Sequence, residues 1–512
     1  MFDESIATNH LNLIYCQRNI IFELFGESLA LPMAALFWSA LALAFEVVNG
    51  FHDTANAVAT VIYTNSLPPT VAVVWSGLWN FIGVLMSTGA VAFGVVTLLP
   101  VELVLNVGST AGMAMVFSLL LSAILWNLGT WYMGLPASSS HTLIGSILGV
   151  GLAHSMMNAE VFGEGVNWGK TQEVFGSLLL SPLIGFGCSA LLLLLFKLLV
   201  KKPELFQAPK KDRPPPLWIR SILVFTCTGV SFAHGSNDGQ KGMGLVMLIL
   251  IGALPASFAL NEGTTQAEVA RLLQNSVELS AMIEQRFDRS AMSVEEATLE
   301  LSNYLKPNVS PNRRTAAAIV TLNREVGRHL AHKHTLSDVP RGERTKLRTN
   351  FYLIDEALGK MMKQGRGVDP PLRVSADRYR KDLDGSTRFI PVWVKIAVAL
   401  ALGLGTMVGW RRIVTTVGEK IGKDHLTYAQ GASAELVAML TIGAADRLGL
   451  PVSTTHVLTS GIAGTMAANK SGVQMTTVRN MLLAWVLTLP ACVFLGAALF
   501  GAGIYAISRL GI

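Results

Sequence analysis

The chain has 512 residues, of which 51% are hydrophobic and only 14% are charged, and its mean hydropathy is +0.46. Soluble globular domains carry about 25% charged residues, so the composition excludes that class and indicates a polytopic membrane protein. The formal net charge of +6 does not indicate nucleic-acid binding, because many of the basic residues cluster beside apolar segments.

The N-terminal segment, residues 1–29, is polar and lacks the positive region of a cleaved signal peptide. After it, apolar runs recur that approach the roughly 20 residues needed to cross a bilayer as a helix. These runs are 30–48, 70–98, 110–133, 176–200, 217–236, 240–260, 390–410, 427–446 and 476–508. We expect an all-α polytopic membrane protein with about 10–12 membrane segments, because a β-barrel would show short alternating segments instead.

Two polar regions interrupt the apolar runs. Residues 201–216 form a short basic loop, which the positive-inside rule places in the cytoplasm. Residues 262–388 carry 21 of the 40 lysines and arginines and form a soluble insert, which we also expect on the cytoplasmic side. Within the insert, His329, His332 and His334 do not share one helical face, and the four cysteines of the chain are scattered. We therefore expect neither a metal site nor a cofactor.

A ten-residue motif occurs twice in the chain. GLPASSSHTL, residues 134–143, returns as GLPVSTTHVL, residues 449–458, with six identical positions. An acidic motif also recurs, as NGFHDTANAVAT at 49–60 and AHGSNDGQKGMG at 233–244. Each copy of the acidic motif precedes a copy of the ten-residue motif, so the order is the same both times.

The spacing between the motifs is also kept. Asp53 precedes His141 by 88 residues, and Asp238 precedes His456 by 91 when the insert is left out. The chain therefore contains two homologous halves. They are residues 30–200 and, around the insert, 217–261 with 389–510. Duplicated halves are typical of secondary transporters, whose sites lie between the repeats and use broken helices. We expect two repeats of inverted topology.

The ten-residue motif suits the N-terminus of a helix, because Pro136 and Pro451 lack the N–H that would be unpaired there. Hydroxyls follow each proline: Ser138, Ser139, Ser140, Ser453, Thr454 and Thr455. The apolar stretches beyond each histidine are too short to span a bilayer, so we expect two re-entrant hairpins whose helix N-termini end inside the membrane. Such N-termini bind anions. Ordinary helix capping is the alternative. A serine nucleophile beside His141 has poor helical geometry, so we expect no enzyme.

The acidic motif indicates a coupling site. Asp53 and Asp238 lie in apolar surroundings, where an ionisable side chain is costly and suggests a function. A glycine three residues before each aspartate permits a break in the helix. Asn56 and Lys241 lie three residues beyond each aspartate, on the same helical face. We expect a site for a hard cation or a proton, with a pair of structural carboxylates as the alternative.

These four motifs, in this order, resemble the inorganic phosphate transporter (Pit) family over nearly all of the chain outside the insert. The strings FHDTANAVATVIYT, 51–64, and SNDGQKGMGLVML, 236–248, resemble the bacterial low-affinity phosphate permease branch in particular. The resemblance implies phosphate uptake coupled to a cation, a multi-pass protein of the bacterial cytoplasmic (inner) membrane, and a homodimer. The family's ligands carry over onto Asp53, Asn56, Asp238 and the six hydroxyls.

The sequence departs from the sodium-coupled members of that family. These members tend to have Asn-Asp in both repeats, each followed by Asn three residues later. Here the pairs are His52-Asp53 and Asn237-Asp238, and Lys241 replaces the second Asn. An ammonium group would repel sodium and could contact phosphate as a point charge. We therefore expect proton symport through the aspartates, with His52 and Asn237 beside them.

Several alternatives stay open at the level of the sequence. The resemblance to the bacterial branch implies that phosphate enters as a complex with a divalent metal. A sodium-coupled phosphate symporter and a sulfate permease of the same fold would use the same anion-binding tips. Phosphate at neutral pH carries a proton that an aspartate can accept a hydrogen bond from, which favours phosphate over sulfate.

Overall fold

The computed structural model describes residues 33–53, 55–99, 104, 107–157, 166–210, 213–287, 291–306, 309–365 and 369–510. Within these ranges the ordered elements are helices, and the one extended pairing is an isolated bridge between Gly422 and Val473. The predicted all-α fold class is confirmed. The predicted N-terminal segment, 1–29, lies outside the described residues.

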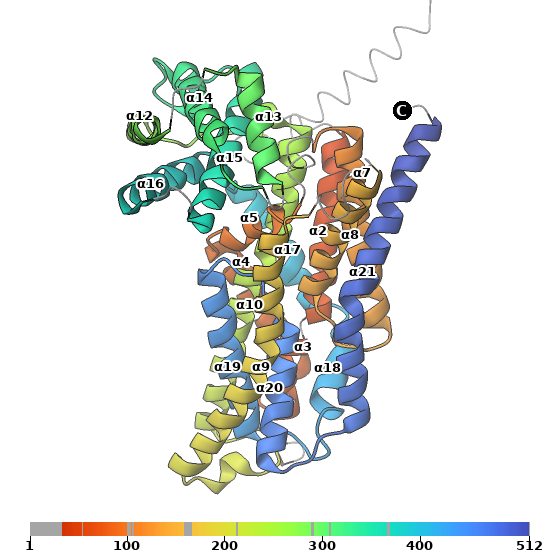
Figure 1. Ribbon diagram of the computed structural model, residues 1–512. Helices are drawn as coiled ribbons and strands as arrows, with labels where there is room; N and C mark the ends of the chain where they lie inside the picture. The colour runs from red at the N-terminus through yellow and green to blue at the C-terminus, as the bar shows by residue number, and fades with distance from the viewer. Residues whose placement is uncertain are drawn as a thin grey trace, which may run out of the picture.

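The membrane part contains two series of helices on either side of a basic loop (Figure 1). The first series is α2 (Met33–Asp53), α3 (Ala55–Tyr63), α4 (Pro69–Met86), α5 (Ala90–Val96), α7 (Thr110–Tyr132), α8 (Ser139–Met157) and α9 (Trp168–Leu199). The loop contains the short helix η1 (Pro203–Phe206). The second series is α10 (Leu217–Ala253), α17 (Val392–Met407), α18 (Arg411–Glu419), α19 (Tyr428–Arg447), α20 (Thr454–Asn469) and α21 (Met475–Leu510).

Six described helices are long and apolar enough to cross a bilayer, when α2 and α3 are counted as one span. A seventh span results if α17 is joined to the preceding helix, from which it is bent by 75°. This number is below the expected 10–12 segments. The predicted runs 217–236 and 240–260 are one helix, α10, and α17 and α20 have only 16 residues each. The most apolar spans, α9 and α21, are also the least buried, as lipid-facing helices should be.

The helix break predicted in the acidic motifs is absent from the second one. In the first motif, Thr54 lies between α2 and α3 and outside the described residues, so the break expected there stays a prediction. Helix α10 is continuous from Leu217 through Asp238 to Ala253, so the break predicted beside Gly235 is wrong. A Cβ at Gly235 would collide with the backbone of Asn80 on α4. This glycine therefore permits close helix packing rather than a break.

The two series exchange packing partners. Helix α8 packs on α21 and α20 packs on α9, while α4 packs on α10 and α17 packs on α2. In each of these four pairs a glycine of one helix faces a backbone carbonyl of the other, which lets the helices approach closely. The contacts are Gly149 with Val493, Gly464 with Phe186, Gly83 with Phe232 and Gly405 with Val47. Each half of the chain thus completes its packing with helices of the other half.

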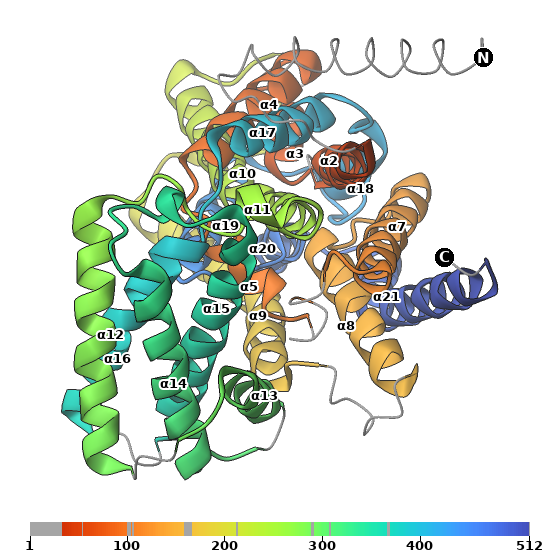
Figure 2. The same cartoon turned by 90° about the horizontal axis from the view of Figure 1, so that it is seen from above.

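The insert is a separate helical layer with its own apolar core, which includes Phe351, Tyr304 and Tyr379. The short helix α11 (Pro255–Phe258) precedes the insert. The helices of the insert are α12 (Gln266–Arg286), α13 (Val294–Leu305), α14 (Arg313–Leu330), η2 (Leu336–Asp338), α15 (Arg341–Gln364) and α16 (Pro370–Thr387). Capping boxes begin α12, α13 and α14, and this explains where these helices start. Seen from above, the insert covers the side of the bundle near α5 and α9 and leaves α7 and α21 uncovered (Figure 2).

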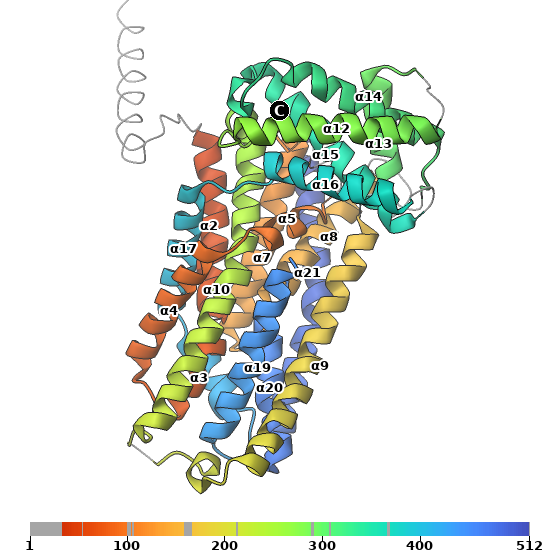
Figure 3. The same ribbon diagram turned by 90° about the vertical axis from the view of Figure 1, so that its left-hand side faces the viewer.

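The insert and the basic loop lie at opposite ends of the bundle. Helix α10 leaves the loop at one end and reaches the insert at the other, and Figures 1 and 3 show the two segments far apart. One continuous helix, α10, separates 201–216 from 262–388, whereas the sequence analysis expected two spans there. Helix α17 returns the chain to the loop end, so Arg411 and Arg412 lie on the same side as the basic loop.

Candidate functional site

The two copies of the ten-residue motif meet in the middle of the bundle. Helix α8 begins at Ser139 and α20 begins at Thr454. The ring centroids of His141 and His456 are 4.6 Å apart, and the Ser140 hydroxyl donates a hydrogen bond of 2.7 Å to the carbonyl of Val452. The predicted convergence of the two hydroxyl-rich helix N-termini is therefore present.

The first hydroxyl of each motif caps its own helix. The Ser138 hydroxyl accepts a hydrogen bond from the His141 backbone N–H at 3.2 Å. The Ser453 hydroxyl accepts the equivalent bond from the His456 N–H at 3.1 Å. These two hydroxyls satisfy backbone donors that a helix N-terminus leaves unpaired. The capping interpretation is thus correct for Ser138 and Ser453, although each also lies at the meeting point.

The second hydroxyls lie between the caps and the charged residues. The Ser139 hydroxyl accepts a hydrogen bond from the Asn127 side chain at 3.3 Å. The Thr454 hydroxyl is buried and has no hydrogen-bond partner among the described residues. A buried hydroxyl without a partner is costly, so Thr454 is available to a ligand.

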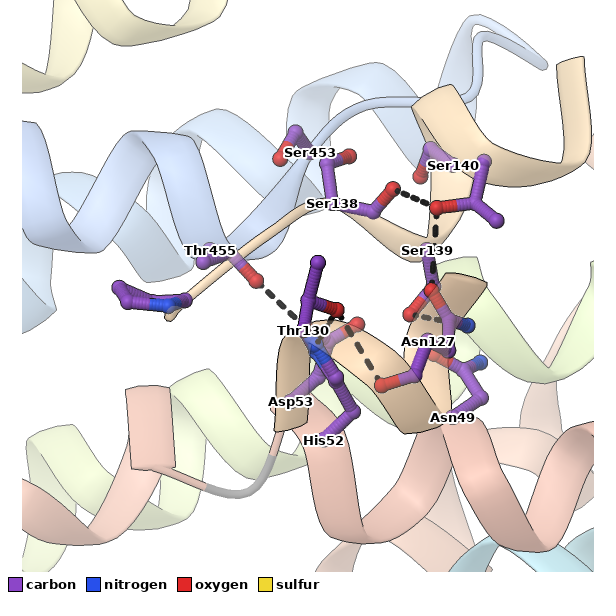
Figure 4. A network of polar contacts seen from close by, with 12 residues as sticks. Asn49, His52, Asp53, Asn127, Thr130, Ser138, Ser139, Ser140, Ser453 and Thr455 are labelled. Atoms are coloured by element: carbon purple, nitrogen blue, oxygen red, sulfur yellow. Dashed lines mark hydrogen bonds and ion pairs between the residues drawn. The ribbon is translucent and has the colours of Figure 1, made fainter. Parts of the chain in front are cut away.

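The third hydroxyl of each motif contacts a charged residue of the other half. The Thr455 hydroxyl donates to Asp53 Oδ1 at 2.5 Å. The Ser140 hydroxyl accepts a hydrogen bond from Lys241 Nζ at 2.5 Å. Figure 4 shows the hydroxyls of both motifs gathered around the end of α2, with Thr455 directed at Asp53. Each anion-binding tip is thus joined to a charged group of the opposite half.

The charged groups form one buried cluster. Lys241 Nζ lies 2.5 Å from Asp238 Oδ1. His234 Nε2 lies 3.3 Å from Asp238 Oδ2 and 4.0 Å from Asp53 Oδ2. All four side chains are less than 5% exposed. With both aspartates ionised, the lysine protonated and the histidine neutral, the cluster carries one net negative charge.

His234 is the residue that the sequence analysis missed. It lies one helical turn before Asp238, and this position faces the aspartate because α10 is continuous. Its Nδ1 contacts Asn80 Oδ1 at 2.9 Å, and Asn80 in turn donates to Thr406 at 2.9 Å. A histidine four residues before an aspartate faces it on a continuous helix, so His234 could have been predicted from the sequence. The break expected at Gly235 would have placed the two residues on separate helices.

The remaining predicted residues have different positions. His52 Nδ1 lies 3.4 Å from Asp53 Oδ1, and its Nε2 lies 3.0 Å from the Thr130 hydroxyl, so His52 belongs to the cluster. Asn237 instead donates to the carbonyl of Leu450 at 3.1 Å, which fixes the backbone at the start of the second motif. The side chain of Asn56 lies outside the described residues.

Comparisons with known proteins agree with this arrangement. The profile described as "Phosphate transporter family" matches residues 49–496, which include both acidic motifs and both hydroxyl motifs. The chain belongs to the phosphate transporter family. It is therefore a transporter of inorganic phosphate and not an enzyme. The Ser138 hydroxyl caps the helix and also lies 2.8 Å from His141 Nδ1.

Relatives within the phosphate transporter family cover nearly the whole chain. The chain is 41% identical to the low-affinity inorganic phosphate transporter PitA of Escherichia coli (strain K12), over 93% of this chain and 97% of the relative. It is also 41% identical to PitB of the same strain, over 90% of this chain and 95% of the relative. A solved structure titled "The sodium-dependent phosphate transporter" matches with a TM-score of 0.51 and 19% identity, over 92% of this chain and 99% of that one, which supports the fold alone.

Proposed function

We propose that this phosphate transporter is a proton symporter of the bacterial inner membrane in which the two hydroxyl tips hold the anion. The N-termini of α8 and α20 carry partial positive charge, and the first turn of α20 holds the hydroxyl of Thr454, which has no partner among the described residues, beside Thr455. The observation that carries the proposal is the pair of cross-half contacts, Thr455 with Asp53 and Ser140 with Lys241. Through them the anion site and the carboxylates act as one unit.

Cation coupling follows from the charges. A phosphate dianion beside a cluster of net charge −1 would be strongly repelled in a buried site, because the local dielectric constant is low. Compensating cations must therefore enter with it. Protonation of Asp53 and Asp238 would remove this repulsion. A protonated Asp53 would also release Thr455 from its present role as donor, so that its hydroxyl could donate to phosphate.

Lys241 favours protons over sodium. Its ammonium group lies next to Asp238, where it supplies the positive charge that a sodium ion would otherwise provide.

Two Escherichia coli relatives are named as low-affinity inorganic phosphate transporters, and this supports phosphate rather than sulfate as the anion.

A divalent metal bound to phosphate is the second candidate for the coupled cation. Asp53, His234 and Asp238 each offer a ligand atom, and these three atoms lie within 4.8 Å of one another. Carboxylate oxygens and an imidazole nitrogen suit several divalent ions. Such an ion would neutralise the anion at the same place where protons would act.

The exchanged packing partners support two repeats of inverted topology. The pairs α8–α21 and α20–α9 are equivalent under exchange of the halves, as are α4–α10 and α17–α2. In transporters of this kind, one group of helices moves against the other around a central site. The hairpins that begin with α8 and α20 would then be re-entrant, with their N-termini near the middle of the membrane.

The charges of the short loops support one orientation. The end opposite the insert carries basic residues in short connections: Lys201, Lys202, Lys210, Arg213, Arg411, Arg412, Lys420, Lys423 and Lys470. Short loops determine orientation, whereas long soluble segments follow the rule poorly. That end is therefore cytoplasmic, and the insert faces the periplasm.

Uptake of labelled phosphate into proteoliposomes tests the proposal. A pH gradient, acidic outside, should drive accumulation, and a sodium gradient should not. Accumulation driven by sodium alone would contradict proton symport. In a third arm, labelled Mn²⁺ is offered with phosphate. Equimolar uptake of metal and phosphate that His234→Asn abolishes would favour the metal–phosphate alternative.

Two variants test the roles of the carboxylates. Asp53→Asn and Asp238→Asn should lose accumulation against a gradient, because neither amide can bind or release a proton. Full accumulation by both variants would refute the assignment of these residues as the coupling groups.

A further inference from the structure

The insert and the membrane helices together line a second cavity. Its volume is about 840 Å³. The membrane wall comes from α5, the start of α9 and the end of α19, and the other wall comes from α13, α15 and α16 of the insert. Cavities of this size hold small-molecule ligands. Figure 2 shows α5 and α9 beside the insert helix α15, in agreement with this lining.

The lining of this cavity is rich in cations. Six basic side chains line it, together with the carboxylates Glu356 and Asp384, and two of the cations, Arg380 and Arg388, are also paired with Asp355. The basic residues are Lys170, Lys360, Lys363, Arg380, Arg388 and Arg447. A concave surface with one dominant sign of charge focuses the field and concentrates counter-ions.

Two of these cations are not neutralised by carboxylates. Lys360 Nζ donates to the backbone carbonyl of Lys306 at 2.6 Å and to that of Tyr304. No ion pair involves Arg447 within the described ranges, and its side chain is exposed. Lys170 and Lys363 share a single carboxylate, Glu173, at 2.9 and 3.7 Å. Positive charge is therefore available to a ligand on both walls.

Burial also disfavours the charged form of one of these groups. Desolvation lowers the pKa of Lys360 to about 8. An anion in the cavity would favour the protonated lysine again, so anion binding and protonation of Lys360 support each other.

The lining of the cavity reaches the start of the second hydroxyl motif. Arg447, Leu448 and Gly449 line it, and Gly449 is the first residue of the second hydroxyl motif. The adjacent Asp446 accepts hydrogen bonds from Ser236 at 2.8 Å and from Gln240 at 2.5 Å.

Gln240 lies on the path between the cavity and the phosphate site. Its carbonyl oxygen accepts a hydrogen bond from the backbone N–H of Val91, on α5, at 2.9 Å. The next residue in the chain is Lys241, which contacts the hydroxyl tip of α8. Gln240 and Asp446 therefore connect Val91, next to the cavity residue Ala90, with the neighbour of Lys241.

We propose that this cavity is a second anion site, in which phosphate-class oxyanions bind before they pass Asp446 and Gln240 to the hydroxyl tips. The insert then has a role in transport, because it supplies four of the six cations. The inference rests on the proposed phosphate site at the hydroxyl tips, and it concerns capture of the anion rather than coupling.

The test compares two triple variants of the full-length protein in whole-cell phosphate uptake. Lys360→Gln/Lys363→Gln/Arg447→Gln removes three cations of the cavity. The matched control, Lys333→Gln/Arg341→Gln/Lys346→Gln, removes the same charge from half-buried or exposed insert positions that do not line it. At low ionic strength the cavity variant should raise the half-saturating phosphate concentration by about fivefold and leave the maximal rate unchanged. The difference should shrink at high salt.

Two outcomes would overturn the proposal. One is an equal half-saturating concentration in both variants, and the other is a loss of maximal rate in the cavity variant. A different result would show that the proposed phosphate site itself is wrong. In that case the Asp53→Asn variant would accumulate phosphate normally at every concentration.

Inhibition by pyrophosphate distinguishes two possible ligands of the cavity, the transported phosphate and a phosphorylated regulator. If the cavity receives the transported anion, pyrophosphate should inhibit uptake competitively in the wild type and lose potency in the cavity variant. Inhibition of the maximal rate without competition, again lost in the cavity variant, would assign the anion site to a phosphorylated regulator. Equal inhibition of wild type and cavity variant would contradict an anion site in the cavity.

Discussion

The hydroxyl of Thr455, in the second half of the chain, lies 2.5 Å from Asp53 Oδ1 in the first half. This contact links an anion-binding helix tip to a carboxylate that is 402 residues away in the sequence. Both residues are buried, so the hydrogen bond is made in a medium of low dielectric constant. It is the shortest route by which protonation of the carboxylate can change the anion site.

We expect Thr455→Val to lower phosphate uptake strongly. Valine keeps the shape of threonine but removes the hydroxyl, and a hydrogen bond to a charged group contributes about 1.5–3 kcal/mol. The uptake rate at low phosphate should therefore fall roughly tenfold to a hundredfold.

Thr455→Ser is the control for this prediction, because it keeps the hydroxyl and should retain most of the uptake. Initial rates of labelled phosphate uptake, corrected for the amount of protein in the membrane, provide the measurement. Equal rates for the valine and serine variants would show that the hydroxyl has no role in transport.

The sequence predicted the partners in this contact but not the contact itself. Duplicated motifs at matched spacing indicated that the two hydroxyl tips and the two aspartates belong to one site, and the structure brings them together. The sequence could not assign capping to Ser138 and ligand contact to Ser140. Both are serines in one turn, and only the orientation of the turn distinguishes them.

Two errors of the sequence analysis have a common physical origin. The glycine beside Asp238 was interpreted as a helix break, and the runs before and after it as two spans. In the structure Gly235 accommodates the backbone of α4, and helix α10 continues through it. Tertiary packing decided between two uses of glycine that look identical in a sequence.

The same glycine gives a prediction on stability. We expect Gly235→Ala to destabilise the protein by about 1–3 kcal/mol, because the added Cβ would collide with the backbone of Asn80 and force the helices apart. The control is Gly187→Ala in α9, where nothing lies within 4 Å of the new Cβ. That substitution should be neutral or slightly stabilising, since alanine favours helices.

Thermal unfolding in detergent, followed by circular dichroism, measures both glycine variants. If Gly235→Ala unfolded at the same temperature as Gly187→Ala, the close approach of α4 and α10 would not be a constraint on the fold.

The buried pair Lys241 and Asp238 gives a third prediction. Lys241→Gln leaves Asp238 without its cation in a buried site, and removal of one partner of such a pair costs about 3–5 kcal/mol. We expect this variant to be poorly expressed or unstable. The double variant Asp238→Asn/Lys241→Gln replaces both charges with neutral groups, so it should recover the folded protein without recovering phosphate accumulation.

Expression level, melting temperature and uptake should be measured for the two single variants and the double variant. Recovery of accumulation in the double variant would show that the ion pair is structural and takes no part in coupling. A double variant as unstable as Lys241→Gln would show that loss of the pair does not act through an unpaired charge.

The lowered pKa of Lys360 gives a prediction on pH dependence. The Lys360 ammonium group is charged below a pKa of about 8 and loses its charge as the pH rises through that value. Transport that relies on this charge should therefore weaken between pH 7 and pH 9, with a rise in the half-saturating phosphate concentration. The other titratable groups near it in the cavity are Lys363, Glu356, Asp384, Arg380 and Arg388, with Tyr304 beneath the ammonium group.

Lys360→Arg separates this effect from the proton dependence of coupling, because a guanidinium remains charged throughout the range. We expect the half-saturating concentration of the arginine variant to change less between pH 7 and pH 9 than that of the wild type. Lys360→Gln should show the high value already at pH 7. Uptake is measured across a constant imposed pH difference, so that the driving force stays the same while the absolute pH changes. Identical pH profiles for wild type, arginine variant and glutamine variant would show that Lys360 does not contribute to anion capture.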